Sequence, residues 1–517
     1  MNISRKNFLI CGASAFGALG AFGGNRFFAS SGTSIKPSGR PRLRFGVVSD
    51  IHVRNVGTGT DIFDVCNNLT FRHALEYFRS MDVDAVVLAG DMTDYETVPE
   101  MAAVAETWYS VFPGDRYPDG RPVAKVFVTG NHDWEGHLYN DYVNTTYPDP
   151  AERAKNILQN DMAGNWKRFF HEEYRPIYSK NINGYTFIGS HWDAGGFGAE
   201  TGRKVYPFGR IQDWMTANSR KIDPSLPFFY IQHPHPKDTC YGPRAWGHDA
   251  GISTKTLARF SNAIAFSGHT HYPLTDERSI WQGEFTSVGT SSLRYTSSTS
   301  LGHLRKDGYE NCRAGDSGNW RTDAEKMLPA LRGMYNSRQG MLWSVYDECI
   351  IVQRREFLSD LDIGDAWVLP LPAAESKPFA FAEHSRRCRA PEFSPGAKLE
   401  ITAIMSKNRG GKSPDGKETI APALKSAFTV KAPAVSPVAN ARLFSMEFTM
   451  ETPDGKKQTK RIIAKGFNLP ERHSGAESPQ LCIFSGKYPP GAELRFTATP
   501  VNCFGTRGKP LTATFKT

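Results

Sequence analysis

The sequence predicts two domains of different class, an α/β domain followed by a smaller all-β sandwich domain. Between residues 43 and 128, three apolar runs alternate with two helix-like segments, which is typical of a mostly parallel sheet with helical crossovers. Beyond residue 376, short β-type runs are separated by turn residues, as in a β-sandwich. The proline-rich stretch 369–378 lies between the two patterns and indicates a boundary. We therefore expect one domain over residues 41–372 and another over residues 376–517.

Length and composition agree with this division. A chain of 517 residues is too long for one ordinary hydrophobic core. Its 39% hydrophobic and 22% charged residues lie in the range of globular proteins. The net charge of +9 comes without a long basic run, so we expect no nucleic-acid polymer as a partner. A positive field would still favour small anionic ligands.

The first 30 residues have the pattern of an export signal. The basic pair Arg5-Lys6 precedes an apolar run, rich in Gly and Ala, that extends to about Gly24, and small residues follow. The segment resembles a twin-arginine (Tat) signal in which Lys6 replaces the second arginine. The alternative is a membrane anchor, but the short run of small residues favours cleavage. We expect a periplasmic or extracellular protein with a linker over residues 31–40 and no transmembrane segment after signal removal.

The eight cysteines do not form a metal-binding pattern. One of them, Cys11, lies in the predicted signal, and no CxxC motif occurs. An exported chain can form disulfides, and Cys482 with Cys503 is the best candidate pair because both lie in one small domain.

The first domain is predicted to alternate strands with helices. The strands are expected over residues 43–49, 84–89, 123–128, 185–189, 228–231 and 263–266, and the helices over residues 68–80, 99–109, 150–159, 166–170 and 210–220. Residues 134–175 look like an insertion, and residues 297–321 like a long polar loop. The runs 285–288 and 341–352 are expected to close a second sheet.

In the sandwich domain we expect strands over residues 398–402, 444–448, 461–464 and 494–498. Pro453-Asp454-Gly455 is predicted to form a hairpin turn.

The polar residues at the strand ends of the first domain form one chemically consistent set. They are Asp50, His52, Asp91, Asn131, His132, His233, His269 and His271. Such a mixture of oxygen and nitrogen ligands suits divalent ions such as Zn²⁺, Mn²⁺ or Fe rather than Ca²⁺. The set is too large for one tetrahedral ion, so we expect two ions with Asp91 as the shared anionic bridge.

The spacing of these residues supports a shared site. In the D-x-H of Asp50 and the H-x-H of His269, residues i and i+2 at a strand end face the same way. Taken singly, such motifs are commonplace, and a Gly-Asn-His-Asp sequence is more often a turn. Five polar strand ends in one chain favour a metal site over unrelated turns.

The ordered motifs resemble those of a known family, the calcineurin-like metallophosphoesterases. The motifs are Asp50-x-His52, Gly90-Asp91-x-x-Asp94, Gly130-Asn131-His132-Asp133, His233 and Gly268-His269-x-His271. The resemblance covers about residues 43–290 and implies two central mixed sheets flanked by helices, in four α/β/β/α layers.

The resemblance also implies roles for the site residues. Asp50, His52 and His271 would bind the first ion. Asn131, His233 and His269 would bind the second, and Asp91 would bridge the two. His132 would protonate the leaving alkoxide, with Asp94 orienting it. His235, two residues beyond His233, stays open as an alternative ligand, although His233 directly ends the strand.

Two positions differ from branches of this family. Tyr95 stands where the protein phosphatases carry Arg, which disfavours a phosphoprotein substrate. Asp94 stands where the purple acid phosphatases carry a tyrosine ligand, so we expect no iron–tyrosinate colour.

The predicted function is therefore that of an exported dinuclear phosphoesterase. It would hydrolyse a small or glycan-linked phosphomonoester or phosphodiester through a metal-bridging hydroxide, with Mn, Fe or Zn as the ions. Residues 341–371 and the tail from about residue 376 resemble the corresponding segments of exported bacterial members, and residues 497–505 resemble a fibronectin type III strand and turn. The alternative is a metal-containing protein that binds a glycan or envelope component through its tail, with little turnover.

Overall fold

The structure of the chain is a computed structural model. It describes residues 37, 39–54, 62–139, 141–192, 210–242, 245–296, 337–373, 375–408, 411–412, 419–420, 423–435, 442–464, 467–470 and 479–517. The predicted export signal and the predicted loop 297–321 lie outside the described residues. Across the described ranges, no helix combines the length and the apolar character needed to cross a bilayer.

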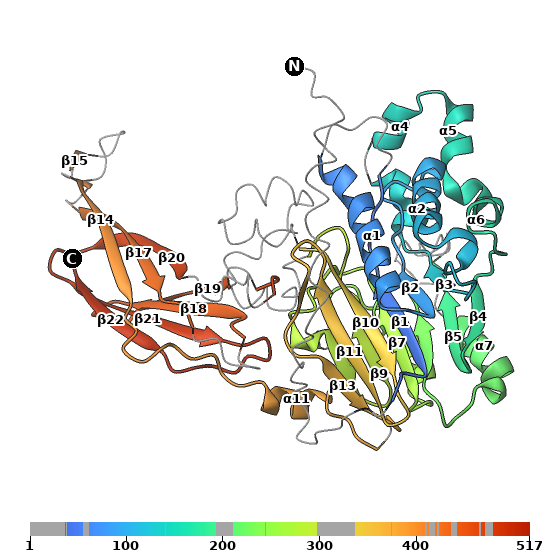
Figure 1. Cartoon of the computed structure of the whole chain (residues 1–517). Coiled ribbons are helices and arrows are strands. Elements are labelled where there is room, and N and C mark those ends of the chain that lie inside the picture. Colours follow the sequence, from blue (N-terminus) through green and yellow to red (C-terminus); the bar gives the residue numbers. More distant parts are fainter. Residues whose placement is uncertain are drawn as a thin grey trace, which may run out of the picture.

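The first sheet begins with three parallel strands, as predicted. These are β1 (Leu43–Val48), β2 (Ala85–Ala89) and β3 (Ala124–Val128). The connecting helices α1 (Ile62–Ser80) and α2 (Val98–Val111) pack on one face of the sheet (Figure 1). All five residues of β2 are buried, which explains why its sequence is continuously apolar.

The sequence analysis placed residues 341–352 in the second sheet, but in the structure they complete the first sheet. The run 341–352 forms two strands, β10 (Gln339–Val345) and β11 (Cys349–Glu356), and β10 pairs antiparallel with β1. The strands β12 (Leu361–Asp362) and β13 (Trp367–Pro370) then pair with β11. Local sequence does not specify which sheet edge a strand completes, because this pairing joins residues about 300 positions apart.

The second sheet has the strand order β4-β5-β6-β7-β9-β8. Its strands are β4 (Ile177–Ile182), β5 (Tyr185–Ser190), β6 (Phe228–Ile231), β7 (Ala263–Ser267), β8 (Ile280–Gln282) and β9 (Thr286–Gly289). The short strands β4 and β8 were not predicted. Phe45 of the first sheet meets Phe229 of the second, with ring centroids 4.8 Å apart, so the two sheets share one core.

Helices cover both outer faces of this pair of sheets. The outer face of the second sheet packs against α7 (Arg210–Asn218) and α8 (Ile252–Leu257). The helix α3 (His132–Glu135) overlaps the start of the predicted insertion. The insertion contains α4 (Tyr142–Thr146), α5 (Pro150–Asn156) and α6 (Met162–Phe170), of which α6 packs beside α1 and α2 on the first sheet. The predicted α/β core is confirmed, with its helix, sheet, sheet and helix layers.

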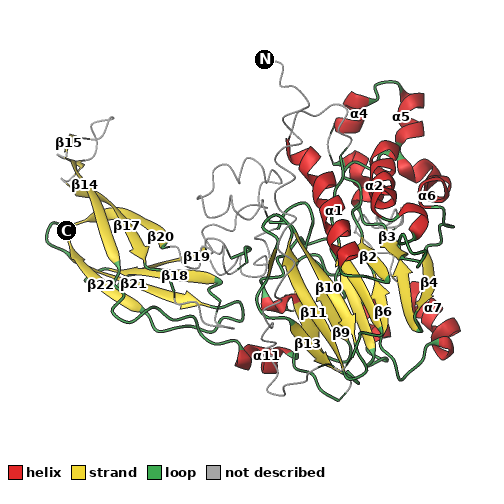
Figure 2. Cartoon of the chain, viewed as in Figure 1, coloured by secondary structure: helices red, strands yellow, loops and turns green. Residues whose placement is uncertain are grey.

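The C-terminal region is an all-β body, also as predicted, and Figure 1 shows it beside the N-terminal domain, with α11 (Phe381–Arg387) on the connection. Its strands are β14 (Glu400–Asn408), β15 (Gly411–Lys412), β16 (Thr419–Ile420), β17 (Ala423–Ala432), β18 (Ser445–Glu451), β19 (Lys457–Ile463), β20 (Gln480–Tyr488), β21 (Glu493–Val501) and β22 (Leu511–Lys516). The sheets β14-β17-β20 and β19-β18-β21-β22 enclose one apolar core. In Figure 2 the helices are concentrated in the N-terminal domain.

In the C-terminal region, the sequence analysis predicted a hairpin turn and a disulfide, and only the turn is confirmed. The turn between β18 and β19 is confirmed, because Thr452 and Lys456 are hydrogen-bonded across Gly455, whose φ is 80°. The expected disulfide is wrong, because Cys482 and Cys503 are not bonded to each other. Cys482 packs inside the sandwich core, whereas Cys503 follows β21 and lies in a cavity with Cys388.

Candidate metal centre

The site lies where strands of both sheets end. Asp50, Asp91 and Asn131 follow β1, β2 and β3, and His233 and His269 follow β6 and β7. Backbone hydrogen bonds join these loops: Asp50 N donates to Gly90 O at 3.0 Å, and Gly268 N donates to His233 O at 2.8 Å. The face-to-face packing of the two sheets thus brings the predicted polar ends into one cluster.

The backbone of the site is unusual for its residue types. Five predicted ligands have positive φ angles: Asp50 (51°), His52 (47°), Asp91 (51°), His269 (70°) and His271 (55°). Non-glycine residues rarely adopt this left-handed conformation, and it costs on the order of 1 kcal/mol or more per residue. Surrounding packing must therefore impose it, and the result is that side chains from neighbouring loops converge.

Two glycines of the motifs permit this convergence. Gly90 has a φ of 98°, and a Cβ atom there would lie 2.3 Å from Nδ1 of His233. At Gly130 a Cβ atom would lie 2.2 Å from Oδ1 of Asp91. The glycine before each polar residue is therefore required by close approach of another ligand loop.

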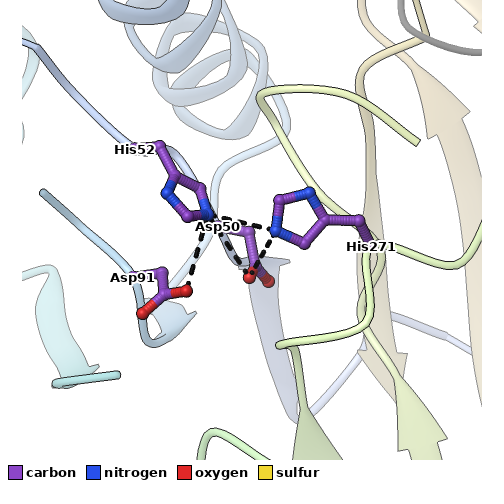
Figure 3. Close-up of side chains that lie close together, drawn as sticks. All are labelled: Asp50, His52, Asp91 and His271. Carbon is purple, nitrogen blue, oxygen red and sulfur yellow. Dashed lines mark hydrogen bonds and ion pairs between the residues drawn. The ribbon is translucent and has the colours of Figure 1, made fainter. Parts of the chain in front are cut away.

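Asp50, His52, Asp91 and His271 form the first group of potential ligands. Nε2 of His52 lies 3.0 Å from Nε2 of His271 and 3.5 Å from Oδ2 of Asp91, and Nε2 of His271 lies 3.0 Å from Oδ1 of Asp50. Figure 3 shows both rings turned toward each other and toward the two carboxylates. These four side chains therefore aim their donor atoms at one point.

The second group contains Asp91, His233 and His269. Nε2 of His233 lies 3.1 Å from Oδ2 of Asp91 and also 3.1 Å from Oδ1 of Asn131. Because Asp91 belongs to both groups, it occupies the position that a bridging carboxylate needs.

The second nitrogen of each buried histidine is committed elsewhere. Nδ1 of His52 donates to Oδ1 of Asp94 at 2.9 Å, and Nδ1 of His233 donates to the carbonyl of Ala89 at 2.8 Å. Nδ1 of His271 faces the carbonyl of Tyr295 at 3.2 Å. Histidines that bind metals have this arrangement, in which one nitrogen donates outward and the other presents its lone pair.

These donor atoms fit divalent ions. Two nitrogens bound at about 2.1 Å to one ion, at right angles, lie about 3 Å apart, which is close to the separation of the His52 and His271 nitrogens. Burial alone would lower the pKa of His52, but its hydrogen bonds with Asp50 and Asp94 outweigh burial and raise the pKa to about 9. In the protein without ions, the proton on His52 therefore balances part of the negative charge of the buried carboxylates. Bound cations would replace this proton.

His132 lies at the edge of the cluster rather than inside it. Its side chain is 25% exposed, and its backbone N–H donates to Oδ1 of Asp91 at 2.8 Å. Nδ1 of His132 lies 2.8 Å from the backbone carbonyl of Asp94 but 3.5 Å from the nearer carboxylate oxygen of that residue. The resemblance implied that Asp94 orients His132 but did not say through which atom. The shorter contact of His132 is with the backbone carbonyl of Asp94.

The carboxylate of Asp94 is instead held by two arginines. Nε of Arg54 donates to Oδ2 of Asp94 at 2.5 Å, and Arg294 donates to Oδ1. Burial would raise the pKa of Asp94, but Arg294, His52 and Arg54 hold it well below its usual value. Sequence reasoning missed both arginines, because a guanidinium is not a metal ligand and Arg294 is 200 residues from Asp94.

His235, left open as an alternative ligand, points away from both groups. Its Nδ1 lies 2.6 Å from Oγ of Ser267, and its Nε2 lies 2.8 Å from Oγ1 of Thr270. Both ring nitrogens are thus used in supporting the loop that carries His269. The geometry places His233, and not His235, among the potential ligands.

Asp133 is another supporting residue that the sequence did not single out. Its carboxylate accepts hydrogen bonds from the backbone N–H groups of Thr93 and Gly130, each at 2.8 Å. It therefore connects the loop of Asp91 to the loop of Asn131. Its place within the Gly-Asn-His-Asp motif was the available signal.

Comparisons with known proteins agree with this geometry. Residues 43–273 match the family model described as calcineurin-like phosphoesterase. A search of curated proteins found no match.

Among solved structures, the matches to this chain have low sequence identities and low TM-scores. A dimetal phosphatase from Danio rerio is 12% identical with a TM-score of 0.34, over 62% of this chain and 98% of that one. A purple acid phosphatase from yellow lupin is 11% identical with a TM-score of 0.34, over 63% and 53% of the two chains. Zinc-complexed Vps29 from Entamoeba histolytica is 9% identical with a TM-score of 0.25, over 63% and 99%. Through residues 43–273, the chain is therefore similar to the calcineurin-like phosphoesterases.

Proposed function

We propose that this protein hydrolyses phosphoesters with two divalent ions held by seven residues. Asp50, His52 and His271 would hold one ion, Asn131, His233 and His269 the other, and Asp91 both. The observation that carries the proposal is the position of Asp91, which lies in the two groups described above. His132 lies in neither of these two but in a third group, with His52 and Asp94, and its backbone N–H donates to Asp91. Bound ions would lower the pKa of a water molecule to supply a nucleophile and would stabilise charge on the phosphoryl oxygens.

The protein's own contribution to the reaction centres on His132. Its Nδ1 is held by the Asp94 carbonyl, so Nε2 is the atom that can deliver a proton to the leaving oxygen. Burial lowers the pKa of His132 to about 4, so the ring is neutral near pH 7 in the protein without substrate. A bound phosphate is anionic and favours the protonated ring, which couples substrate binding to the availability of the proton.

The test is hydrolysis of para-nitrophenyl phosphate and of bis(para-nitrophenyl) phosphate by the full chain, after metal removal and after addition of Mn²⁺, Zn²⁺ or Fe²⁺. We expect turnover with at least one ester, and its loss in Asp91→Ala and in His132→Ala. Turnover that survives both substitutions would contradict the proposal. Stoichiometric metal without turnover on either ester would favour the metal-containing binding protein instead.

We also propose that the protein is exported through its N-terminal segment. Cell fractionation of the full chain should place it outside the cytoplasm in a shortened form. If the route is the twin-arginine one, Arg5→Lys should retain the protein inside the cell, because no arginine would remain in the basic pair. Export of the Arg5→Lys protein at the normal level would exclude that route.

A further inference from the structure

Two exposed aromatic side chains lie against the site histidines that reach the surface. Trp246 is 56% exposed, and its ring stacks on that of His269 with centroids 4.8 Å apart and planes 17° apart. Tyr139 is 42% exposed, and its ring centroid lies 4.6 Å from that of His132. The partly exposed edge of the candidate centre is therefore bordered by aromatic surface on two sides.

Trp246 is held in this position by its neighbours in the chain. The carbonyl of Gly247 accepts a hydrogen bond from the backbone N–H of His235 at 2.9 Å. A Cβ atom on Gly247 would lie 2.4 Å from Cγ2 of Thr270, so this loop packs directly on the loop that carries His269. A single exposed apolar side chain is ordinary. An exposed tryptophan fixed on a potential metal ligand, with one face covered by that ligand, is a preformed stacking platform.

Tyr139 turns its hydroxyl inward and its ring toward the surface. The hydroxyl accepts a hydrogen bond from Nδ2 of Asn131 at 2.9 Å and donates to Oε2 of Glu135 at 3.0 Å. The ring is thereby fixed beside His132, where the leaving oxygen of a substrate would be protonated.

We propose that Trp246 and Tyr139 bind the organic part of the phosphoester, and that this part carries a planar aromatic ring, as in an aryl or nucleoside phosphate. This inference rests on the proposed function and adds the class of substrate. A flat ring can stack on Trp246, whose other face is covered by His269, and the rings of Trp246 and Tyr139 suit a planar ligand better than they suit a flexible polyol.

The test compares two esters on the full chain loaded with the metal that supports turnover: 1-naphthyl phosphate and glycerol 2-phosphate. Trp246→Ala should raise KM for the naphthyl ester about tenfold, because losing a stacking partner has roughly that effect, and should leave the glycerol ester almost unchanged. Trp246→Phe should restore most of the loss, because it keeps a ring. Phe381→Ala is the matched control, since Phe381 is an aromatic residue 48% exposed in α11, outside the candidate centre.

Calorimetry provides a second measurement that does not depend on turnover. Phenylphosphonate should bind the metal-loaded protein more tightly than methylphosphonate, and Trp246→Ala should remove that preference. Equal losses for the aryl and glycerol esters, or an unchanged KM for both, would overturn the proposal. So would a larger loss with glucose 1-phosphate than with the naphthyl ester, which would identify a sugar-binding surface. If the normal protein hydrolyses no ester, the proposed function fails, and the phosphonate comparison alone then decides this inference.

Discussion

The two domains differ in where non-glycine residues adopt positive φ angles. Every described non-glycine residue with positive φ lies between Asp50 and Asp360, and none lies in the described part of residues 376–517. In the sandwich, β20 alternates buried and exposed residues over most of its length, as an unstrained antiparallel strand does. Five of the fourteen non-glycine residues with positive φ are predicted ligands, whereas the described part of the sandwich reaches positive φ angles with glycine alone.

The domains also differ in what they bury. The N-terminal domain buries carboxylates and imidazoles, among them Asp50, Asp91 and His233. Among the described residues beyond 390, the buried polar side chains are all neutral: Ser426, Ser445, Asn468, Gln480 and Asn502. Burying charged groups is costly unless they are paired or bind ions, so their presence in one domain locates the chemistry there.

The largest expected effect comes from Asp91, because both ligand groups contain it. Asp91→Asn should lower kcat by about 10³-fold and reduce bound metal, as measured by turnover and elemental analysis. The ion-free protein should be less stable in thermal unfolding, since burial would raise the pKa of Asp91 but His233 holds it below its usual value, and Asn would leave the buried imidazole of His233 without this anion. Glu447→Gln in the sandwich is the control and should leave turnover unchanged. A loss of turnover in the control would mean that the domains do not divide their roles in this way.

The next effect concerns Glu277, which connects the N-terminal domain to α11. It accepts hydrogen bonds from Arg354 at 2.7 Å and Trp367 at 2.9 Å, and lies 3.2 Å from His384. Burial would raise its pKa, but Arg354 and His384 hold it well below 4.5. The carboxylate therefore contributes stability above about pH 4.5 that is lost as the pH falls. Glu277→Gln should cost roughly 3 kcal/mol at pH 7 and flatten the acid branch of the stability curve.

Unfolding in urea between pH 3 and pH 8 measures this effect. An unchanged pH profile would show that the ion pair does not stabilise the junction. Turnover at pH 7 should change little, because Glu277 lies in neither ligand group.

His132 should have the third effect. His132→Asn should lower kcat by about 10²-fold with para-nitrophenyl phosphate, and by less with a better leaving group, because the substitution removes a proton donor. Bound metal should stay the same, since His132 is not assigned as a ligand. A fall in metal content equal to that of Asp91→Asn would instead make His132 part of the ligand set.

The smallest effect is expected at Tyr139. Tyr139→Phe keeps the ring but removes the hydroxyl that accepts from Nδ2 of Asn131, so the amide loses the contact that orients its oxygen. We expect metal affinity to fall about tenfold, measured by competition with a chelating dye, with little change in KM for an aryl ester. A larger change in KM than in metal affinity would assign the hydroxyl to substrate binding.

Particular residues show what the sequence by itself determined. An apolar run that ends in Gly-Asp or Gly-His is a local pattern, and from it the positions of Asp91 and His269 at strand ends could be predicted. The alternation of strands and helices likewise predicted the α/β core, because it depends on neighbouring residues. The short turn at Gly455 was predictable for the same reason.

Only the tertiary structure decided the rest, because it depends on contacts between distant segments. The pairing of β10 with β1, the hydrogen bonds of Asp94 with Arg54 and Arg294, and the stacking of Trp246 on His269 have no local signature. The sequence favoured His233 over His235 only because His233 directly ends the strand, and packing decided the choice by turning the ring of His233 toward Asp91. Sequence thus placed the polar residues at the strand ends, and the packing of two sheets turned them into a site.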